Sequence, residues 1–111
     1  MDPMTRDQFF NFHKAFCEEA LKLSQRKNAD YAGADGQQPF ANFQRVESLG
    51  VCSTEKGFLV RMVDKLSRLS SYSDAGKFEV KDEGVRDTLI DVVNYACLLA
   101  AYIEAKNSGR L

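Results

Sequence analysis

The residues best suited to chemistry lie in the most apolar stretch of the chain, from Gly84 to Ile103. Asp87, Asp91 and Asn94 occur there at positions i, i+4 and i+7, a spacing that places all three on one face of a helix. A carboxylate is rarely buried unless it is paired or holds a metal. This stripe therefore predicts a cation beside it, either Mg²⁺ with water and a phosphate, or a lysine or arginine from another helix.

A second polar stripe, of mixed charge, lies on the helix predicted before this one. It consists of Arg61, Asp64, Lys65 and Arg68. Because arginine and lysine bind phosphoryl oxygens, the stripe is a candidate for phosphate binding. The alternative is a solvated face whose charges pair with each other or with the acidic stripe.

Two further groups are weaker candidates. Lys27, Asp30 and Tyr31 fall in a predicted loop, where they could contact the base, sugar or phosphate of a nucleotide, or form a turn that ends the preceding helix. Glu18 and Glu19 occur on the first predicted helix. One of them could reach a shared metal, and the alternative is an exposed acidic pair.

Helix start and stop signals predict an all-α bundle of three long helices and one short one. Thr5 and Gln8 match a capping box, and Asp82 is a good N-cap. Gly50 and Gly76 occur where helices are expected to stop. The expected helices run from near Pro3–Thr5 to about Arg26–Asn28, over Phe40–Leu49, from Ser53 or Thr54 to Tyr72–Lys77, and from Asp82 to about Lys106.

The apolar residues predict a core and a dimer. The expected core faces are Phe9, Phe12, Phe16, Ala20 and Leu23 on the first helix, and Leu59, Met62, Val63, Leu66, Leu69 and Ser70 on the third. Cys17 and Cys97 fall on apolar faces, which favours buried thiols. The last helix is apolar on nearly all sides between Val92 and Ile103, so self-association through it, most simply as a homodimer, is expected to complete the bundle.

Composition limits the class of protein. A chain of 111 residues is expected to form a single domain, residues 1–111. The net charge of −1 does not favour binding to nucleic acid or to an anionic membrane. Polar residues within the apolar stretch argue against a membrane span. Three cysteines without a basic, apolar leader favour a reducing cytoplasm.

Four short segments together resemble the nucleotide modification associated domain 1 family, found largely in bacteriophages and bacteria. They are KNADYAG from Lys27, ANF from Ala41, VDKLSRL from Val63 and DEGVRDTLIDVVNYACLL from Asp82. That family is similar to the MazG-like all-α nucleoside triphosphate pyrophosphohydrolases. The resemblance implies a helical dimer or tetramer that uses Mg²⁺ to split a nucleotide into a monophosphate and pyrophosphate, in a bacterial or phage-infected cell.

The chain departs from the wider superfamily at the acidic motifs. Asp91 matches the aspartate of the later acidic pair, but Asp87 lies four residues before it and Thr88 occupies the position three before. The earlier ExxE pair is absent, and only Asp64 could serve as an acid on that helix, beside Lys65 and other cations. The predicted pocket therefore suits the binding of phosphates better than the concentration of metal charge.

Three functional hypotheses follow. The first is a Mg²⁺-dependent nucleotide pyrophosphohydrolase, in which Asp87 and Asp91, with Glu18 or Glu19 and Asp64, hold the metal. Nucleotide contacts are then expected from Lys65, Arg68, Asn94, Lys27, Asp30 and Tyr31. The second is a binder that sequesters a nucleotide or a cyclic nucleotide signal, and so blunts a host defence, without turnover. The third is an interaction module whose charged stripes only pair with each other.

Overall fold

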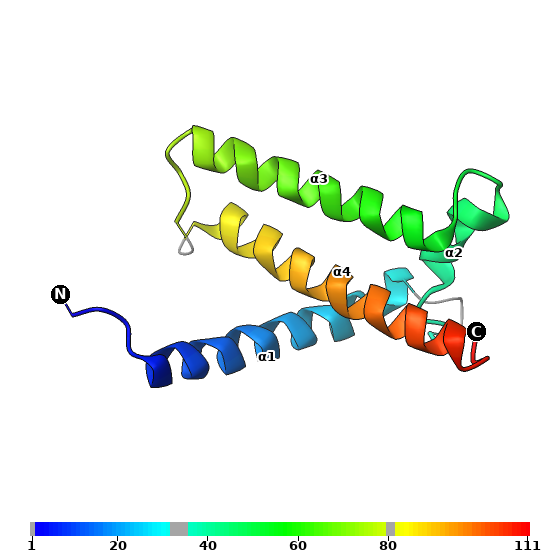
Figure 1. The fold of residues 1–111 in the computed structure, drawn as a ribbon, viewed down its shortest axis with the longest axis horizontal. Coiled ribbons are helices and arrows are strands. Elements are labelled where there is room, and N and C mark those ends of the chain that lie inside the picture. Colours follow the sequence, from blue (N-terminus) through cyan, green and yellow to red (C-terminus); the bar gives the residue numbers. More distant parts are fainter. Residues whose placement is uncertain (1, 32–35, 80–81) are drawn as a thin grey trace.

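The computed structural model describes residues 2–31, 36–79 and 82–111, and of residues 29–31 the backbone only. The described residues form helices and no strand, so the predicted all-α class is confirmed. Three helices are long and one is short, as predicted. They are α1 (Arg6–Tyr31), α2 (Ala41–Ser48), α3 (Thr54–Asp74) and α4 (Glu83–Asn107), shown in Figure 1.

The predicted helix starts are confirmed by their capping contacts. At α1 the Thr5 amide donates to Gln8 Oε1 over 2.9 Å, and the Gln8 amide donates to Thr5 Oγ1 over 3.1 Å, which is a complete capping box. The Ser53 hydroxyl caps α3, and the Asp82 carboxylate caps α4 by accepting from two backbone amides. Because such caps satisfy backbone donors left free at helix ends, they fix where each helix begins.

The end of α1 differs from the sequence prediction. The helix continues to Tyr31, so the stretch from Lys27, expected as a loop, forms the last turn of α1. The Asn28 side chain, which could have ended the helix by bonding to nearby backbone, instead donates to the Gly36 carbonyl over 3.0 Å. Lys27 is anchored to α4 (described below). Both side chains thus have partners from later in the chain, and neither is used to end the helix.

α4 occupies the middle of the bundle. It runs antiparallel to α3 on one side and packs against α1 on the other, while α2 contacts α1 and α3 near the end of the bundle where α3 begins (Figure 1). A cluster of buried aromatic residues lies at that end and consists of Phe43, Phe58 and Tyr102, while Ala20, Val85 and Ile90 are buried outside this cluster. The Phe43 and Phe58 rings stack with their centroids 4.4 Å apart. This aromatic cluster joins α2, α3 and α4 in one core.

Several residues predicted to be buried are exposed. On α1 these are Phe9 and Phe12, and on α3 they are Leu59, Val63 and Leu66. Cys17 and Cys97 are also exposed, which contradicts the buried thiols predicted from their apolar surroundings. The reason is the thin, elongated arrangement, because the radius of gyration is 16.3 Å whereas a compact domain of this length has about 13 Å. Within the described residues, each long helix therefore keeps apolar side chains that no other helix covers.

The α4 helix is long and apolar enough, by length and composition alone, to cross a membrane. Only 17% of its most apolar window is buried within the chain. The core helix of a soluble protein passes the same test, and α4 carries the ion pair described in the next section. The absence of membrane insertion remains a prediction.

Candidate functional site

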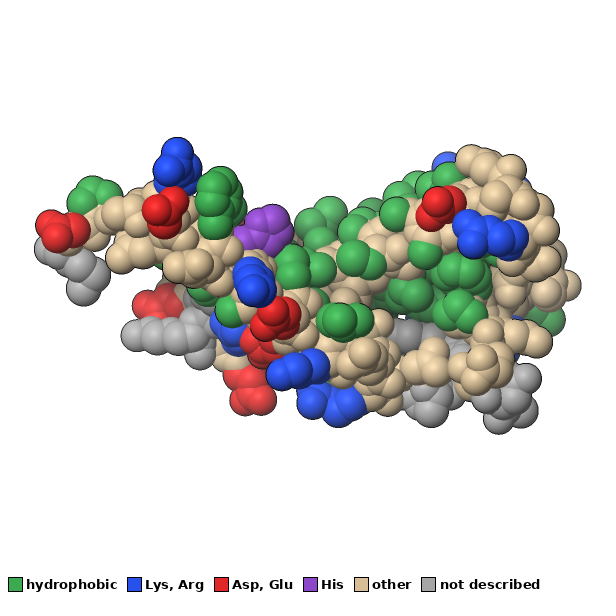
Figure 2. Space-filling model, turned by 90° about the horizontal axis from the view of Figure 1, so that it is seen from below, with side chains coloured by type: hydrophobic (Ala, Val, Ile, Leu, Met, Phe, Trp, Pro, Cys, Tyr) green, Lys and Arg blue, Asp and Glu red, His purple; other side chains and the backbone are tan. Residues whose placement is uncertain are grey.

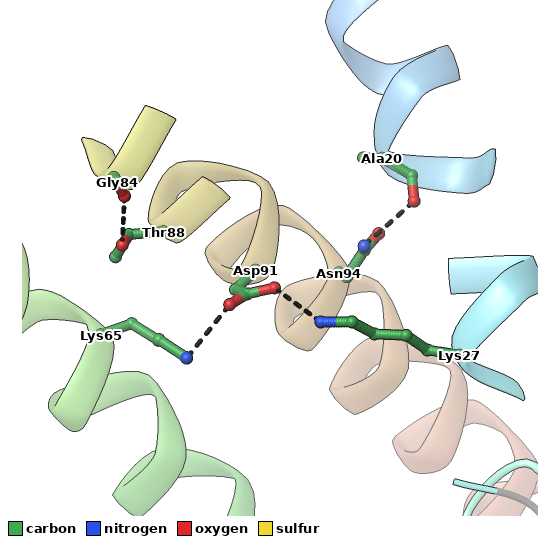
Figure 3. Close-up of polar contacts among 7 residues, drawn as sticks. All are labelled: Ala20, Lys27, Lys65, Gly84, Thr88, Asp91 and Asn94. Carbon is green, nitrogen blue, oxygen red and sulfur yellow. Dashed lines mark hydrogen bonds and ion pairs between the residues drawn. The ribbon is translucent and has the colours of Figure 1, made fainter. Parts of the chain in front are cut away.

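Asp91 is the point at which three helices meet through charged side chains. Its carboxylate on α4 pairs with Lys65 Nζ of α3 over 3.0 Å and with Lys27 Nζ of α1 over 3.5 Å (Figure 3). The side chains of Asp91 and Lys65 are 19% and 14% exposed, whereas that of Lys27 is 37% exposed. Of the two partners foreseen for Asp91, a metal or a basic side chain, the structure provides the second, and it provides two of them.

One turn further along α4, Asn94 ties the same helix to α1. Its amide nitrogen donates to the Ala20 carbonyl over 3.0 Å, and Ala20 is among the most buried residues (Figure 3). One turn before Asp91, the buried Thr88 hydroxyl donates to the Gly84 carbonyl of its own helix over 2.7 Å. Asn94 therefore positions α1 against α4, while Thr88 is satisfied within α4 and offers no donor to α1 or α3.

The predicted mixed-charge stripe of α3 is divided between two faces of the helix. Lys65 turns toward Asp91, whereas Asp64 and Arg68 pair with each other at 3.4 Å on the solvent side. The Arg61 guanidinium lies over the Phe43 ring, 4.5 Å from its centroid. Only Lys65 of this stripe therefore joins the acidic stripe, and Arg68 lies in solvent one turn along α3.

A second ion pair links α1 to α4 between Glu19 and Arg86. The Arg86 guanidinium also lies over the Phe16 ring, 5.1 Å from its centroid. The hydrogen bond from Arg86 is the main cause that lowers the pKa of Glu19 below its ordinary value, and nearby positive charge adds to it. Arg86 was not among the predicted site residues. Its one sequence signal was its place next to Asp87 at the start of the acidic stripe.

We expect the Glu19–Arg86 pair to make stability depend on acid pH. Because the pKa of Glu19 in the folded chain is below its ordinary value of 4.5, the folded state binds fewer protons than the unfolded state. The pair's contribution is therefore complete above about pH 5 and is lost as the pH falls through the lowered pKa. Thermal melts between roughly pH 3 and pH 7 should show a smaller acid loss of Tm in Glu19→Gln than in the wild type.

Glu18→Gln provides the matched control for that experiment. Glu18 is the preceding residue of α1 and is exposed. Its variant should follow the wild-type curve. If the Tm of Glu19→Gln fell with pH as steeply as that of the wild type, the pair would contribute nothing to the loss of stability in acid.

The other predicted site residues lie apart from Asp91 or outside the described residues. Asp87 is exposed on the first turns of α4, and Glu18 is exposed on α1. The backbones of Asp30 and Tyr31 belong to the last turn of α1, but their side chains lie outside the described residues. The side chains that the structure does bring together are those of Asp91, Lys65 and Lys27, with Asn94 beside them.

The contacts of Asp91 determine whether the described residues can hold the predicted Mg²⁺. Within the described parts of the chain, no three histidine, cysteine, aspartate or glutamate side chains converge on a position for an ion. Asp91, the half-buried carboxylate of the predicted acidic stripe, faces an ammonium group on each oxygen. A divalent cation there would meet two positive charges before it met a second carboxylate. The described residues of one chain therefore do not fit a Mg²⁺ site.

The same geometry suits an anion. Each lysine ammonium has three N–H donors, so Lys27 and Lys65 retain donors after binding Asp91. Two ammonium groups against one carboxylate leave a local charge of one positive unit. A phosphate oxygen placed between the lysines would receive charge-assisted hydrogen bonds from both.

Comparisons of this chain with models of protein families, with curated proteins and with solved structures found no match.

Proposed function

We propose that this protein binds the phosphate group of a nucleotide between Lys27 and Lys65 and releases the nucleotide unchanged. The observation that supports this proposal is the single carboxylate, Asp91, that holds two lysines from two different helices. One lysine is enough to balance the charge of Asp91. The second lysine gives the cluster a net positive charge at a half-buried position, which favours an anionic ligand.

Asp91 acts in this proposal as a positioning residue. A lysine side chain has four rotatable bonds, and fixing it on binding costs up to about 2 kcal/mol of conformational entropy. Asp91 holds both ammonium groups before the ligand arrives, so part of this cost is met during folding. Asp30, Tyr31 and Arg68 remain the predicted contacts to the rest of the nucleotide.

The pyrophosphohydrolase predicted from the family resemblance is the competing proposal. It requires Asp91 to exchange its two lysines for Mg²⁺ and Asp87 to turn toward the same ion. The described contacts favour the binder, because they commit both Asp91 oxygens to lysines. The resemblance to nucleotide modification associated domain 1, the cytoplasmic location and dimerisation through α4 are further parts of the proposal.

Isothermal titration with a panel of nucleoside mono-, di- and triphosphates and cyclic nucleotides tests the proposal. Each titration is run with Mg²⁺ and with a chelator, and the nucleotide is recovered and identified by chromatography. We expect binding that persists in the chelator and a ligand that is recovered intact. Cleavage that needs Mg²⁺ and stops in Asp91→Ala would instead establish the hydrolase.

Lys65→Met is the informative variant for binding. Loss of a hydrogen bond to a charged group costs about 1.5–3 kcal/mol, so we expect the affinity to fall roughly 10- to 100-fold. Lys56→Met is the matched control, since Lys56 is an exposed lysine on the same helix. Equal affinities of the two variants would contradict a role for Lys65. The absence of binding by any nucleotide to the wild-type protein would overturn the proposed function.

A further inference from the structure

Arg61 on α3 is a half-buried cation whose charge no acid of the described residues balances. Its guanidinium lies over the buried Phe43 ring, and no ion pair among the described residues includes it. On the face shown in Figure 2, by contrast, lysine and arginine side chains lie beside aspartate or glutamate over much of the surface. Because a charge partly withdrawn from water is costly unless it is paired, Arg61 favours a ligand that supplies hydrogen-bond acceptors.

Arg61 lies on the same face of α3 as Lys65. The two residues are four positions apart, so their Cα atoms are separated by about 6 Å along the helix axis. Tyr95 follows Asp91 on α4 by the same interval, and its ring meets that of Phe43 edge-on, with the centroids 6.2 Å apart. The pair of Asp91 and Lys65 is thus followed, toward α2, by a group that contains Arg61, Tyr95 and Phe43.

The surroundings of Arg61 suit a flat base better than a second phosphate. Two aromatic rings offer no hydrogen bonds in the plane of a phosphate to replace its lost water, but they can pack against a planar ring. A guanidinium whose face lies on Phe43 keeps its N–H donors along its edge, where they form a planar fork. Such a fork matches O6 and N7 of guanine, whereas adenine presents one acceptor and one donor on that edge.

We propose that the nucleotide bound at Lys27 and Lys65 is a guanine nucleotide, and that Arg61 donates two hydrogen bonds to O6 and N7 of its base. This assignment rests on the proposed function, because it takes the phosphate to lie between the two lysines. In a purine nucleotide with an anti base, N7 is the ring nitrogen nearest to the 5′-phosphate. A phosphate at Lys65 therefore brings N7 toward a side chain one turn away on the same helix face. Phe43 is a positioning residue here, since it fixes the plane of the guanidinium.

Four triphosphates that differ only in the purine test the assignment on the wild-type protein. They are GTP, inosine triphosphate, ATP and 7-deaza-GTP, and each is titrated calorimetrically in a chelator. Inosine keeps O6 and N7, so its triphosphate should bind as tightly as GTP. ATP should bind roughly 5- to 150-fold more weakly, which is the discrimination typical of one bidentate base contact. 7-Deaza-GTP lacks the N7 acceptor and should also bind more weakly than GTP.

Arg61→Lys separates the shape of the fork from its charge. Lysine keeps the positive charge but cannot donate two parallel hydrogen bonds, so the preference for GTP over ATP should be lost while the affinity for ATP changes little. Arg45→Lys is the matched control, since Arg45 is an exposed arginine on α2. It should keep the wild-type preference. Circular dichroism of each variant checks that its helices remain.

The outcomes separate this assignment from the proposed function. Equal affinities of the wild type for GTP and ATP would overturn the role of Arg61, and the phosphate site would still stand if Lys65→Met weakened both. A GTP preference that persists in Arg61→Lys, or that does not depend on N7, would overturn it as well. If none of the four nucleotides binds, both the assignment and the proposed function fail.

Discussion

Replacing Phe58 with alanine should remove a large part of the chain's stability while leaving a folded population that can be titrated with denaturant. The Phe58 side chain is fully buried and stacks on Phe43, and its ring centroid lies 6.1 Å from that of Tyr102. Truncating a buried phenylalanine to alanine costs about 3–5 kcal/mol. A domain of this size is stable by only about 5–15 kcal/mol, and the described core is small. The truncation therefore removes a large part of the free energy of unfolding.

Chemical denaturation followed by far-ultraviolet circular dichroism measures this loss. Phe78→Ala is the matched control, because it removes the same atoms from an exposed position. It should change the free energy of unfolding by less than about 0.5 kcal/mol. Similar values for Phe58→Ala and Phe78→Ala would mean that the aromatic cluster does not stabilise the fold.

The second large effect is expected at Asp91. Its replacement by alanine leaves the half-buried ammonium group of Lys65 without its carboxylate partner. Breaking a buried ion pair costs about 3–5 kcal/mol, and the partial exposure of this cluster reduces the expected loss to about 2 kcal/mol. For a chain of this length that corresponds to a fall in Tm of roughly 10 °C.

A double-mutant cycle separates the free energy lost with the ion pair from the cost of leaving the charge of Lys65 without a partner. If Lys65 is the stranded group, Asp91→Ala with Lys65→Met should be more stable than the two single losses added together predict. Asp87→Ala is the control, since Asp87 lies one turn earlier on α4 and is exposed. A Tm for Asp91→Ala as high as that of Asp87→Ala would show that the three-helix cluster is not structural.

The ends of the helices could be read from the sequence because their signals are local. The capping box of Thr5 and Gln8 spans four residues, and the stop of α2 depends on one glycine, Gly50, at φ +76°. The end of α1 could not be read in this way. Asn28 favours a turn when only its neighbours are considered, but in the fold it bonds to Gly36. A partner eight residues later, outside the range of the local signals, takes up the side chain that would otherwise form the turn.

The site was foreseen in part, for a related reason. Opposite charges on two predicted stripes made a pair between Asp91 and Lys65 one of the expected arrangements, and the structure contains it. Sequence spacing alone does not give the rotation of one helix against another. It therefore could not show that Arg68 turns away, that Lys27 supplies the second cation, or that Glu19 meets Arg86. Those outcomes depend on how three helices pack.

The central position of α4 has a consequence for how the chain is made. The polar contacts between α1 and α4 cannot form until α4 has been made, because Ala20 pairs with Asn94 and Lys27 with Asp91. At a synthesis rate of about 5–20 residues per second, roughly 4–15 s separate residue 20 from residue 94 on the ribosome. Tyr102, the third member of the aromatic core, is made later still. The apolar faces of α1 and α3 therefore stay open on the nascent chain until α4 has been made, an interval in which chaperones that bind exposed apolar helices can reach them.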